Sequence, residues 1–354
     1  MARLGDIATY VNGFAFKPTD WSDNGLPIIR IQDLTGNSYQ ANRYNGSYQP
    51  KYEVNDGDVL ISWSASLGVY VWHGEKAVLN QHIFKVVFDK AEVDKNFFVH
   101  QVQNILENAA SEAHGATMKH LTKPVFDALP FYLPSMRKQK EIASVLNKTA
   151  ELIALRKEQL AKLDQLVKSR FIELFGDPIT NSNNLPTERM ELRFNLKAGI
   201  TTAADDIHEF EEGMYEIPCY GGNGIRGYVK EKSYTGNYPI IGRQGALCGN
   251  VQYATGEFHA TEHAVLVSLL KNDNSVWVYH LLKLMDLFRY HTGAAQPGLA
   301  VKTLNTVEVI VADKRKQDQF AAFVEQTDKS KLAIQQSLDK LETLKKSLMQ
   351  EYFG

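Results

Sequence analysis

The sequence is poor in cysteine and contains no long apolar run. Its 354 residues include two cysteines, Cys219 and Cys248, which are too few for a disulfide framework and lack the spacing of a metal site. We therefore expect two buried thiols in a protein of the reducing cytoplasm. No run of about 18 apolar residues occurs and the N-terminus has no apolar signal core, so we expect no membrane span and no membrane partner.

Excess positive charge is also missing. The formal net charge is −2, with 11 basic and 14 acidic residues in segment 1–136 and 12 basic and 16 acidic residues in segment 177–314. A protein that binds nucleic acid alone usually has a basic surface. A DNA-binding role for this chain therefore requires a local patch and a partner that supplies phosphate contacts.

Motifs for catalysis and cofactor binding are absent as well. The sequence has no phosphate-binding loop of the P-loop type, no Cys/His zinc cluster and no adenine-methyltransferase signature. Residues 222–227 spell G-x-G-x-x-G, but a dinucleotide site needs a helix directly afterwards, and residues 228–230 read as a strand. We interpret this motif as a tight glycine loop, and we expect no enzymatic activity from the chain by itself.

An internal repeat is the main positive feature of the sequence. Residues 137–176 and 315–354 align without gaps at an offset of 178, and 14 of 40 positions are identical. Both copies open on Arg-Lys-Gln and end on Phe-Gly, with no proline and no earlier glycine. Each copy is therefore predicted to be one long helix.

Both predicted helices have a heptad seam. It runs from Leu146 to Leu174 in the first copy and from Val324 to Tyr352 in the second, with six of nine positions apolar in each. A helix of roughly 50 Å cannot bury such a stripe within one ordinary domain. We expect the two copies to pack on each other; packing on a partner protein or a homodimeric coiled coil are the alternatives.

The segments that precede the helices repeat as well. In the first, strands are predicted at 26–31, 58–63, 68–72 and 83–88 and a helix at 96–108. In the second, the strand at 238–243 corresponds to the one that ends at Trp63, and His263 corresponds to His82. The two histidines either make a structural hydrogen bond at a strand start or face a ligand. The predicted order is domain, helix, domain, helix, with boundaries at 1–136, 137–176, 177–314 and 315–354.

Taken together, these features resemble the specificity subunit of a Type I restriction–modification system, over the whole chain. The helix entries, the Phe-Gly endings, the stretch 217–227 and the Gly-Ala loops at Gly115 and Gly293 carry the resemblance. It implies an α+β fold in which two pseudo-repeated target-recognition domains of mixed α/β structure are separated by two long antiparallel helices that form a coiled coil.

The resemblance also implies a function and partners. Each domain would read one half of a split site in double-stranded DNA, and the helices would set the gap, since one DNA turn is about 34–36 Å. Two modification subunits would bring S-adenosylmethionine and methylate adenine at N6 after flipping it. Restriction subunits would bring ATP and Mg, while this chain would hold no cofactor. A coiled-coil adaptor with ligand-binding domains and no DNA role is the alternative.

Candidate base-reading residues are polar side chains in loops at strand ends. Arg or Lys suits guanine, and Asn or Gln suits adenine. In the first domain the candidates are Lys17, Arg30, Gln32, Trp63, Ser64, Lys119 and His120. In the second they are Tyr220, Asn223, Arg226, Arg243, Gln244, His259 and Gln296. We favour Lys119, Arg226 and Arg243; for each candidate the alternative is an ordinary exposed polar residue.

Overall fold

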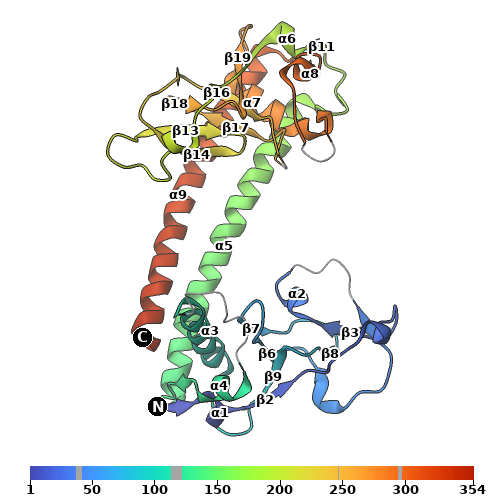
Figure 1. Ribbon diagram of the computed structural model, residues 1–354, viewed down its shortest axis with the longest axis vertical. Coiled ribbons are helices and arrows are strands. Elements are labelled where there is room, and N and C mark those ends of the chain that lie inside the picture. The colour runs from blue at the N-terminus through green and yellow to red at the C-terminus, as the bar shows by residue number, and fades with distance from the viewer. Residues whose placement is uncertain (37–41, 113–121, 246, 294–296) are drawn as a thin grey trace. The chain divides into compact units, whose positions relative to one another are not determined.

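The computed structural model describes residues 1–36, 42–112, 122–245, 247–293 and 297–354. The chain divides into two compact units. The first unit contains residues 1–155 and 337–354, and the second contains residues 156–336. Each unit therefore combines a globular domain with about half of each long helix (Figure 1). Among the described residues, no helix has both the length and the apolarity that crossing a membrane requires.

The described residues of the first unit form three small sheets. The strands of the four-stranded antiparallel sheet, in spatial order, are β2 (Thr9–Asn12), β9 (Ile83–Val87), β6 (Val59–Ser62) and β7 (Gly68–Val71). A second sheet is ordered β4 (Arg43–Tyr44), β3 (Leu26–Ile29), β8 (Ala77–Leu79) and β5 (Glu53–Val54), with β3 and β8 parallel. The third pairs β1 (Ala2–Arg3) with β10 (Pro130–Phe131).

The second unit repeats this topology strand for strand. Its first sheet is ordered β12 (Phe194–Ala198), β19 (Ala264–Leu269), β16 (Tyr238–Gly242) and β17 (Val251–Ala254). Its second is ordered β14 (Gly224–Val229), β13 (Ile217–Gly221), β18 (Glu257–Ala260) and β15 (Tyr234–Thr235). The third pairs β11 (Thr187–Arg189) with β20 (Glu308–Ile310). Every strand label is raised by ten, and the parallel pair recurs as β13 and β18.

Three of the shorter helices occupy matching places in the described parts of the two units. The first unit has α1 (Leu4–Ile7), α2 (Ile31–Leu34), α3 (Lys95–Glu112), α4 (Lys123–Ala128) and the 3-10 turns η1 (Pro18–Asp20) and η2 (Pro50–Tyr52). The second has α6 (Met190–Arg193), α7 (Ser275–Leu284), α8 (Val301–Asn305) and the turns η3 (Ala204–Asp206) and η4 (Leu287–Tyr290). By chain order, α1, α3 and α4 correspond to α6, α7 and α8.

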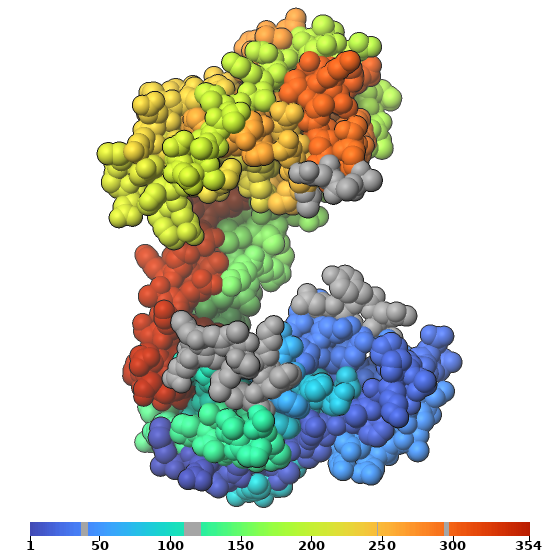
Figure 2. Space-filling view, in the orientation of Figure 1, coloured from blue at the N-terminus to red at the C-terminus, as the bar shows by residue number. Residues whose placement is uncertain are grey.

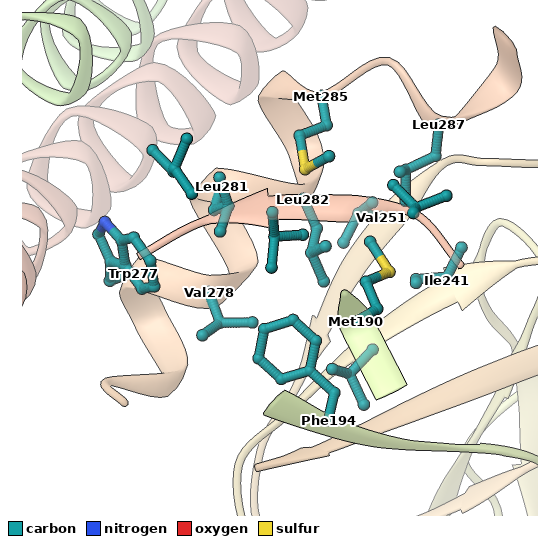
Figure 3. Close-up of a cluster of buried hydrophobic side chains, with 14 of the residues drawn as sticks. Met190, Phe194, Ile241, Val251, Trp277, Val278, Leu281, Leu282, Met285 and Leu287 are labelled. Carbon is teal, nitrogen blue, oxygen red and sulfur yellow. The ribbon is translucent and has the colours of Figure 1, made fainter. Parts of the chain in front are cut away.

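The larger core of the second unit lies between α7 and the antiparallel sheet. Trp277, Val278 and Leu282 of α7 pack with Ile241 of β16 and Val251 of β17, all almost inaccessible to solvent (Figure 3). In the first unit, residues of α3 join a matching cluster with β6 and β9. Since apolar burial is the main source of folding stability, each unit has a core large enough to hold its surface loops in place.

The two long helices span Met136–Phe175 (α5) and Lys314–Phe353 (α9). In the second unit the end of α5 meets the start of α9, with the rings of Phe171 and Phe320 5.3 Å apart. In the first unit the start of α5 meets the end of α9, since Leu146 and Met349 belong to one buried cluster. The predicted long helices are confirmed, they run antiparallel, and their seam positions are buried or half-buried.

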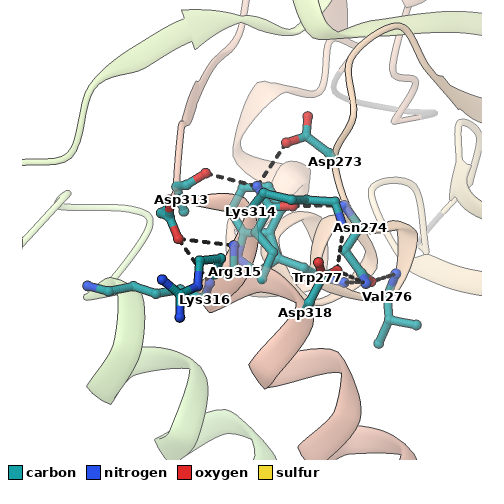
Figure 4. A network of polar contacts seen from close by, with 11 residues as sticks. Asp273, Asn274, Val276, Trp277, Asp313, Lys314, Arg315, Lys316 and Asp318 are labelled. Carbon is teal, nitrogen blue, oxygen red and sulfur yellow. Dashed lines mark hydrogen bonds and ion pairs between the residues drawn. The ribbon is translucent and has the colours of Figure 1, made fainter.

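The glutamine of the repeated Arg-Lys-Gln motif has a structural role in both units. Gln139 accepts a hydrogen bond from the backbone N–H of Asp94 (2.9 Å) and donates one to the carbonyl of Pro134 (2.8 Å). Gln317 does the same with Asn274 (2.8 Å) and Ala312 (3.0 Å). Figure 4 shows Asn274 in the polar network of this region, with Asp273 and Asp318. The side-chain carboxylate of Asp94 and the side-chain amide oxygen of Asn274 accept N–H groups at the starts of α3 and α7, so each glutamine ties a long helix to the helix that covers the sheet.

The structure corrects one predicted boundary and confirms one interpretation. The strand predicted at 26–31 ends at Ile29, because Ile31 already begins α2 and Asp33 caps that turn by accepting the N–H of Arg30 at 2.8 Å. The G-x-G-x-x-G motif is the turn and second strand of the β13–β14 hairpin. No helix follows this motif, in agreement with the rejection of a dinucleotide site.

Candidate nucleic-acid interface

Arg243 lies at the point where β16 leaves the sheet of the second unit. Its backbone N–H donates to the carbonyl of His263 at 3.0 Å, and its own carbonyl accepts the N–H of Leu299 at 2.8 Å. The backbone is thus held from two different segments. The Cα atom of a residue on such a segment has a fixed position, which a side chain that recognises a ligand from a rigid scaffold requires.

Two glycines bring another loop against this strand end. A Cβ atom added to Gly242 would lie 1.9 Å from the carbonyl oxygen of Gly222, so no larger residue fits at position 242. Gly222 and Asn223 form the turn of the β13–β14 hairpin, which closes with Gly221 opposite Gly224. The hairpin turn and the end of β16 therefore form one surface, called here the second strand-end site (Gly222, Asn223, Arg243, Gln244 and Asn250).

The guanidinium group of Arg243 has no protein partner in the described part of the chain. Its Nε atom is shielded from solvent and makes no hydrogen bond to any described residue. Arg193, a more deeply buried arginine of the same unit, has partners, since it donates hydrogen bonds to Asp273 and Glu188. Because a shielded polar group without a partner is unfavourable, Arg243 is poised for an external acceptor.

The remaining polar groups of this site are amides. Asn250 Nδ2 donates to Asn223 Oδ1 at 2.7 Å, which leaves the amide nitrogen of the exposed Asn223 directed elsewhere. Gln244 is exposed, as is Arg226 on β14. Figure 2 shows residues of the β13–β14 region, in yellow-green, on the surface of the second unit. Asn250 is not among the residues predicted from the sequence, since nothing in its local pattern indicates a contact with Asn223.

Trp63 occupies the equivalent position in the first unit. Its N–H donates to the carbonyl of His82 at 3.3 Å, as that of Arg243 does to His263. The side chain is engaged, however: Nε1 donates to Asn12 Oδ1 at 3.3 Å, and the indole stacks on Phe84 at 5.6 Å. The correspondence of the two strand ends and of the two histidines is confirmed, but the two side chains differ in chemistry and in availability.

His259 and Tyr220 lie on the inner strands β18 and β13. His259 Nε2 is 2.8 Å from the hydroxyl of Thr202, and burial lowers the pKa of this imidazole, which favours its neutral form. Tyr220 packs edge-on against Phe258 at 5.6 Å, and burial raises the pKa of its phenol. Tyr220 therefore contributes to the small core under the hairpin.

The candidates of the first unit lie in less uniform settings. Lys17 is exposed at the start of η1, while Arg30 is 3.6 Å from Asp33 and lies over the ring of Trp21. Gln32 is half-buried on α2. Ser64 is only 5 % exposed, and its carbonyl accepts the hydroxyl of Ser62 at 3.1 Å. A base contact by the Ser64 side chain would need local opening.

Three candidates, Lys119, His120 and Gln296, lie outside the described residues, as does the Gly115 loop. Among the residues that are described, no group of three or more His, Cys, Asp or Glu side chains could hold a metal ion. The thiol of Cys219 is buried, and burial raises its pKa to about 11. The described surface of the second unit thus offers hydrogen-bond donors and acceptors at a strand end.

Comparison with known proteins gives a consistent picture. The family described as "Type I restriction modification DNA specificity domain" matches residues 1–165 and 194–345. The specificity subunit of the Type I restriction enzyme EcoprrI from Escherichia coli is 31% identical, over 92% of this chain and 86% of its own length. The EcoBI specificity subunit, also from Escherichia coli, is 29% identical over 47% of this chain and 35% of its length.

Two solved structures share the fold. The S subunit of a Type I restriction–modification system from M. genitalium aligns with a TM-score of 0.63 and 16% identity, over 99% of this chain and 95% of that one. A chain from a study of complex assembly and conformational transition in a type I R-M system aligns with a TM-score of 0.56 and 14% identity, over 99% and 96%.

Proposed function

Because the chain belongs to the Type I restriction–modification DNA specificity family, we propose that it selects the DNA sequence on which a restriction–modification complex acts. Specificity subunits work with other subunits and with DNA. Here each unit reads one half of a bipartite site in double-stranded DNA. The chain supplies no catalytic group of its own, and it works in the cytoplasm.

The duplicated topology is the observation that carries this proposal. In the described part of the chain, twenty strands form two sets of the same three sheets in the same order. In both sets the strand end at Trp63 or Arg243 is held by the carbonyl of the equivalent histidine. Two copies of one reading scaffold, differing in the side chains at the same strand end, suit a site with two unlike halves better than they suit an adaptor.

The long helices set the gap between half-sites and dock the partners. Each helix of 40 residues is about 60 Å long, longer than one turn of DNA. The repeat provides two equivalent docking surfaces, so two modification subunits bind, bring S-adenosylmethionine and methylate a flipped adenine. Restriction subunits bring ATP and Mg for cleavage.

The low positive charge fits a shared interface. With a net charge of −2, this chain neutralises few phosphates by itself, and phosphate contacts dominate affinity for DNA. Phosphate contacts position a protein, whereas base contacts specify the sequence. We therefore assign most phosphate contacts to the modification subunits and the base contacts to this chain.

Methylation mapping tests the proposal. The chain is co-expressed with the modification subunit encoded beside it, and the host genome is sequenced for N6-methyladenine. The expected result is one split motif, with two specified halves separated by a fixed number of unspecified bases. Absence of methylation by a folded complex that contains both subunits would contradict the proposal.

A further inference from the structure

We propose that Arg243 reads a guanine in the half-site bound by the second unit, with two hydrogen bonds to the O6 and N7 atoms on the major-groove edge. This inference rests on the proposed DNA-reading function and adds a residue and a base to it. Of the four bases, guanine alone presents two acceptors side by side in the major groove, and they match the paired donors of a guanidinium group.

The Arg243 backbone is fixed before any ligand binds. It is hydrogen-bonded on one side to His263 and on the other to Leu299, and Gly242 packs directly against Gly222. Base readout through a bidentate contact demands such a fixed origin, because a small displacement removes one of its two hydrogen bonds.

Among the described residues, the Arg243 side chain lacks the carboxylate partner that several other arginines of the chain have. Arg43 contacts Glu75, Arg170 contacts Glu173, and Arg193 contacts Asp273. Arg243 is half-buried, its Nε is shielded, and no described carboxylate lies within ion-pair distance. A partly desolvated guanidinium without an acceptor destabilises the free protein, and an acceptor on the ligand relieves that cost.

The groups beside Arg243 are suited to contact with the edge of a base. A Cβ atom added to Gly245 would meet no atom of the described residues within 4 Å, so these residues leave open space beside the strand end. Asn223 and Asn250 contribute amides, and Gln244 is exposed. Amides pair with adenine and guanidinium groups with guanine, so this site is built for hydrogen-bond readout.

The described part of the first unit has no free guanidinium group at the equivalent strand end. Trp63 takes the position of Arg243, and its only donor, Nε1, is bonded to Asn12. The two half-sites therefore differ at the base that faces this strand end. The guanine contact is assigned to the second unit alone.

The test compares methylation maps of the complex that contains Arg243→Ala with those of the wild-type complex. One guanine in one half-site is expected to become unspecified, while the other half and the gap stay unchanged. In Arg243→Gln the same position should accept adenine, because a glutamine amide matches the adenine edge. An unchanged motif, or a uniform decrease in methylation at all sites, which a phosphate contact would produce, would overturn the proposal.

A binding experiment with unaltered protein removes the question of folding. Duplexes with 7-deazaguanine at each guanine of the mapped motif lack one N7 acceptor at a time. At the guanine read by Arg243, affinity of the wild-type complex should fall about 5- to 150-fold if most of the bidentate discrimination is lost. The Arg243→Ala complex should be insensitive to that substitution, and equal sensitivity would overturn the assignment.

Arg189→Ala is the matched control. Arg189 is an exposed arginine of the same unit on β11, 3.6 Å from Glu191, so its loss removes the same charge without touching the strand end. The methylated DNA motif of the Arg189→Ala complex should be the same as that of the wild-type complex. If the wild-type complex yields no split motif at all, the proposed function fails first, and the two failures are thereby distinguished.

Discussion

Arg193 and Asp273 form a bidentate ion pair in the core of the second unit, with Arg193 Nη2 2.6 Å from both carboxylate oxygens. Both side chains are almost fully buried, and Gln317 Nε2 donates to Asp273 Oδ1 at 2.9 Å. The equivalent positions of the first unit are Ile7 and Val93, which belong to one apolar cluster. The same place in the fold therefore holds charges in one repeat and aliphatic groups in the other.

Removal of one partner should destabilise the second unit strongly. Asp273→Ala leaves a buried guanidinium with only Glu188 to balance it, and breaking such a pair typically costs about 3–5 kcal/mol. Hydrogen exchange followed by mass spectrometry can resolve the two units. Peptides from α7 and β12 should exchange faster, and peptides from α3 and β9 should not change.

The matched control introduces the aliphatic residues that the first unit has at these two positions. The double variant Arg193→Ile, Asp273→Val removes both charges and should recover most of the lost stability, because replacing a whole buried ion pair by apolar residues is often neutral. A double variant as unstable as Asp273→Ala would show that the pair contributes more than mutual charge compensation.

The repeated glutamines should respond differently to the same substitution. Gln139→Glu and Gln317→Glu each lose the donor to a backbone carbonyl, which we expect to cost about 1–3 kcal/mol. At position 317 the new carboxylate also faces that of Asp273, formerly 2.9 Å from the amide nitrogen. Gln317→Glu should therefore be the more destabilising of the two at pH 7.5 in urea unfolding. Equal losses of stability in the two variants would show that the Asp273 carboxylate does not destabilise Gln317→Glu.

The helices could be predicted from the sequence because their packing repeats at one offset. Gln139 and Gln317 are 178 residues apart, as are Thr149 and Thr327, each of which donates its hydroxyl to the carbonyl four residues earlier. In a continuous helix, an insertion that is not a whole number of heptads turns the seam away from the partner. The periodic apolar pattern and the constant offset of 178 residues both result from the need to keep the seams of the two helices in register.

The candidate site could be predicted only in part. Trp63 and Arg243 are 180 residues apart, and His82 and His263 are 181 apart, because surface loops tolerate insertions that helices do not. Residue type also does not reveal burial. Ser64 is 5 % exposed, and Tyr220 packs on Phe258, although both were selected as polar groups at strand ends.

The stability of the second unit should depend on pH through His280. Burial, and secondarily Lys283 and Lys331, lower its pKa from the usual 6.5 to about 3, against an opposing effect of Asp164. Since the folded pKa is depressed, the unfolded chain binds the additional proton. Stability is then fully present above about pH 6.5 and decreases as pH falls towards 3, by at most about 1.4 kcal/mol per pH unit.

Comparison with His280→Leu isolates this contribution. Urea midpoints of the wild type should fall more than those of the variant between pH 7.5 and 5.0, because leucine does not titrate. The ring is partly exposed, so solvent screening keeps the effect below the limit. His100 of α3, whose pKa is also lowered by burial, is unchanged in both proteins. Parallel pH profiles would contradict a buried neutral His280.

Lengthening both long helices should widen the gap in the methylated motif. One heptad inserted after Leu155 in α5 and one after Gln336 in α9 would fall at the boundaries of the compact units, and a heptad preserves the phase of the seam. Seven residues add about 10 Å, which is about three base pairs at 3.4 Å each. The sequences of both halves should stay unchanged in the methylation map.

Methylation at the widened sites should be weaker than in the wild type, since about three base pairs also rotate the groove by roughly a third of a turn. A heptad inserted in α5 alone is the control. It lengthens one helix only, so the seam cannot stay in register on both sides of the insertion, and it should abolish methylation without creating a new gap. An unchanged gap with both insertions would show that the helices do not set the distance between half-sites.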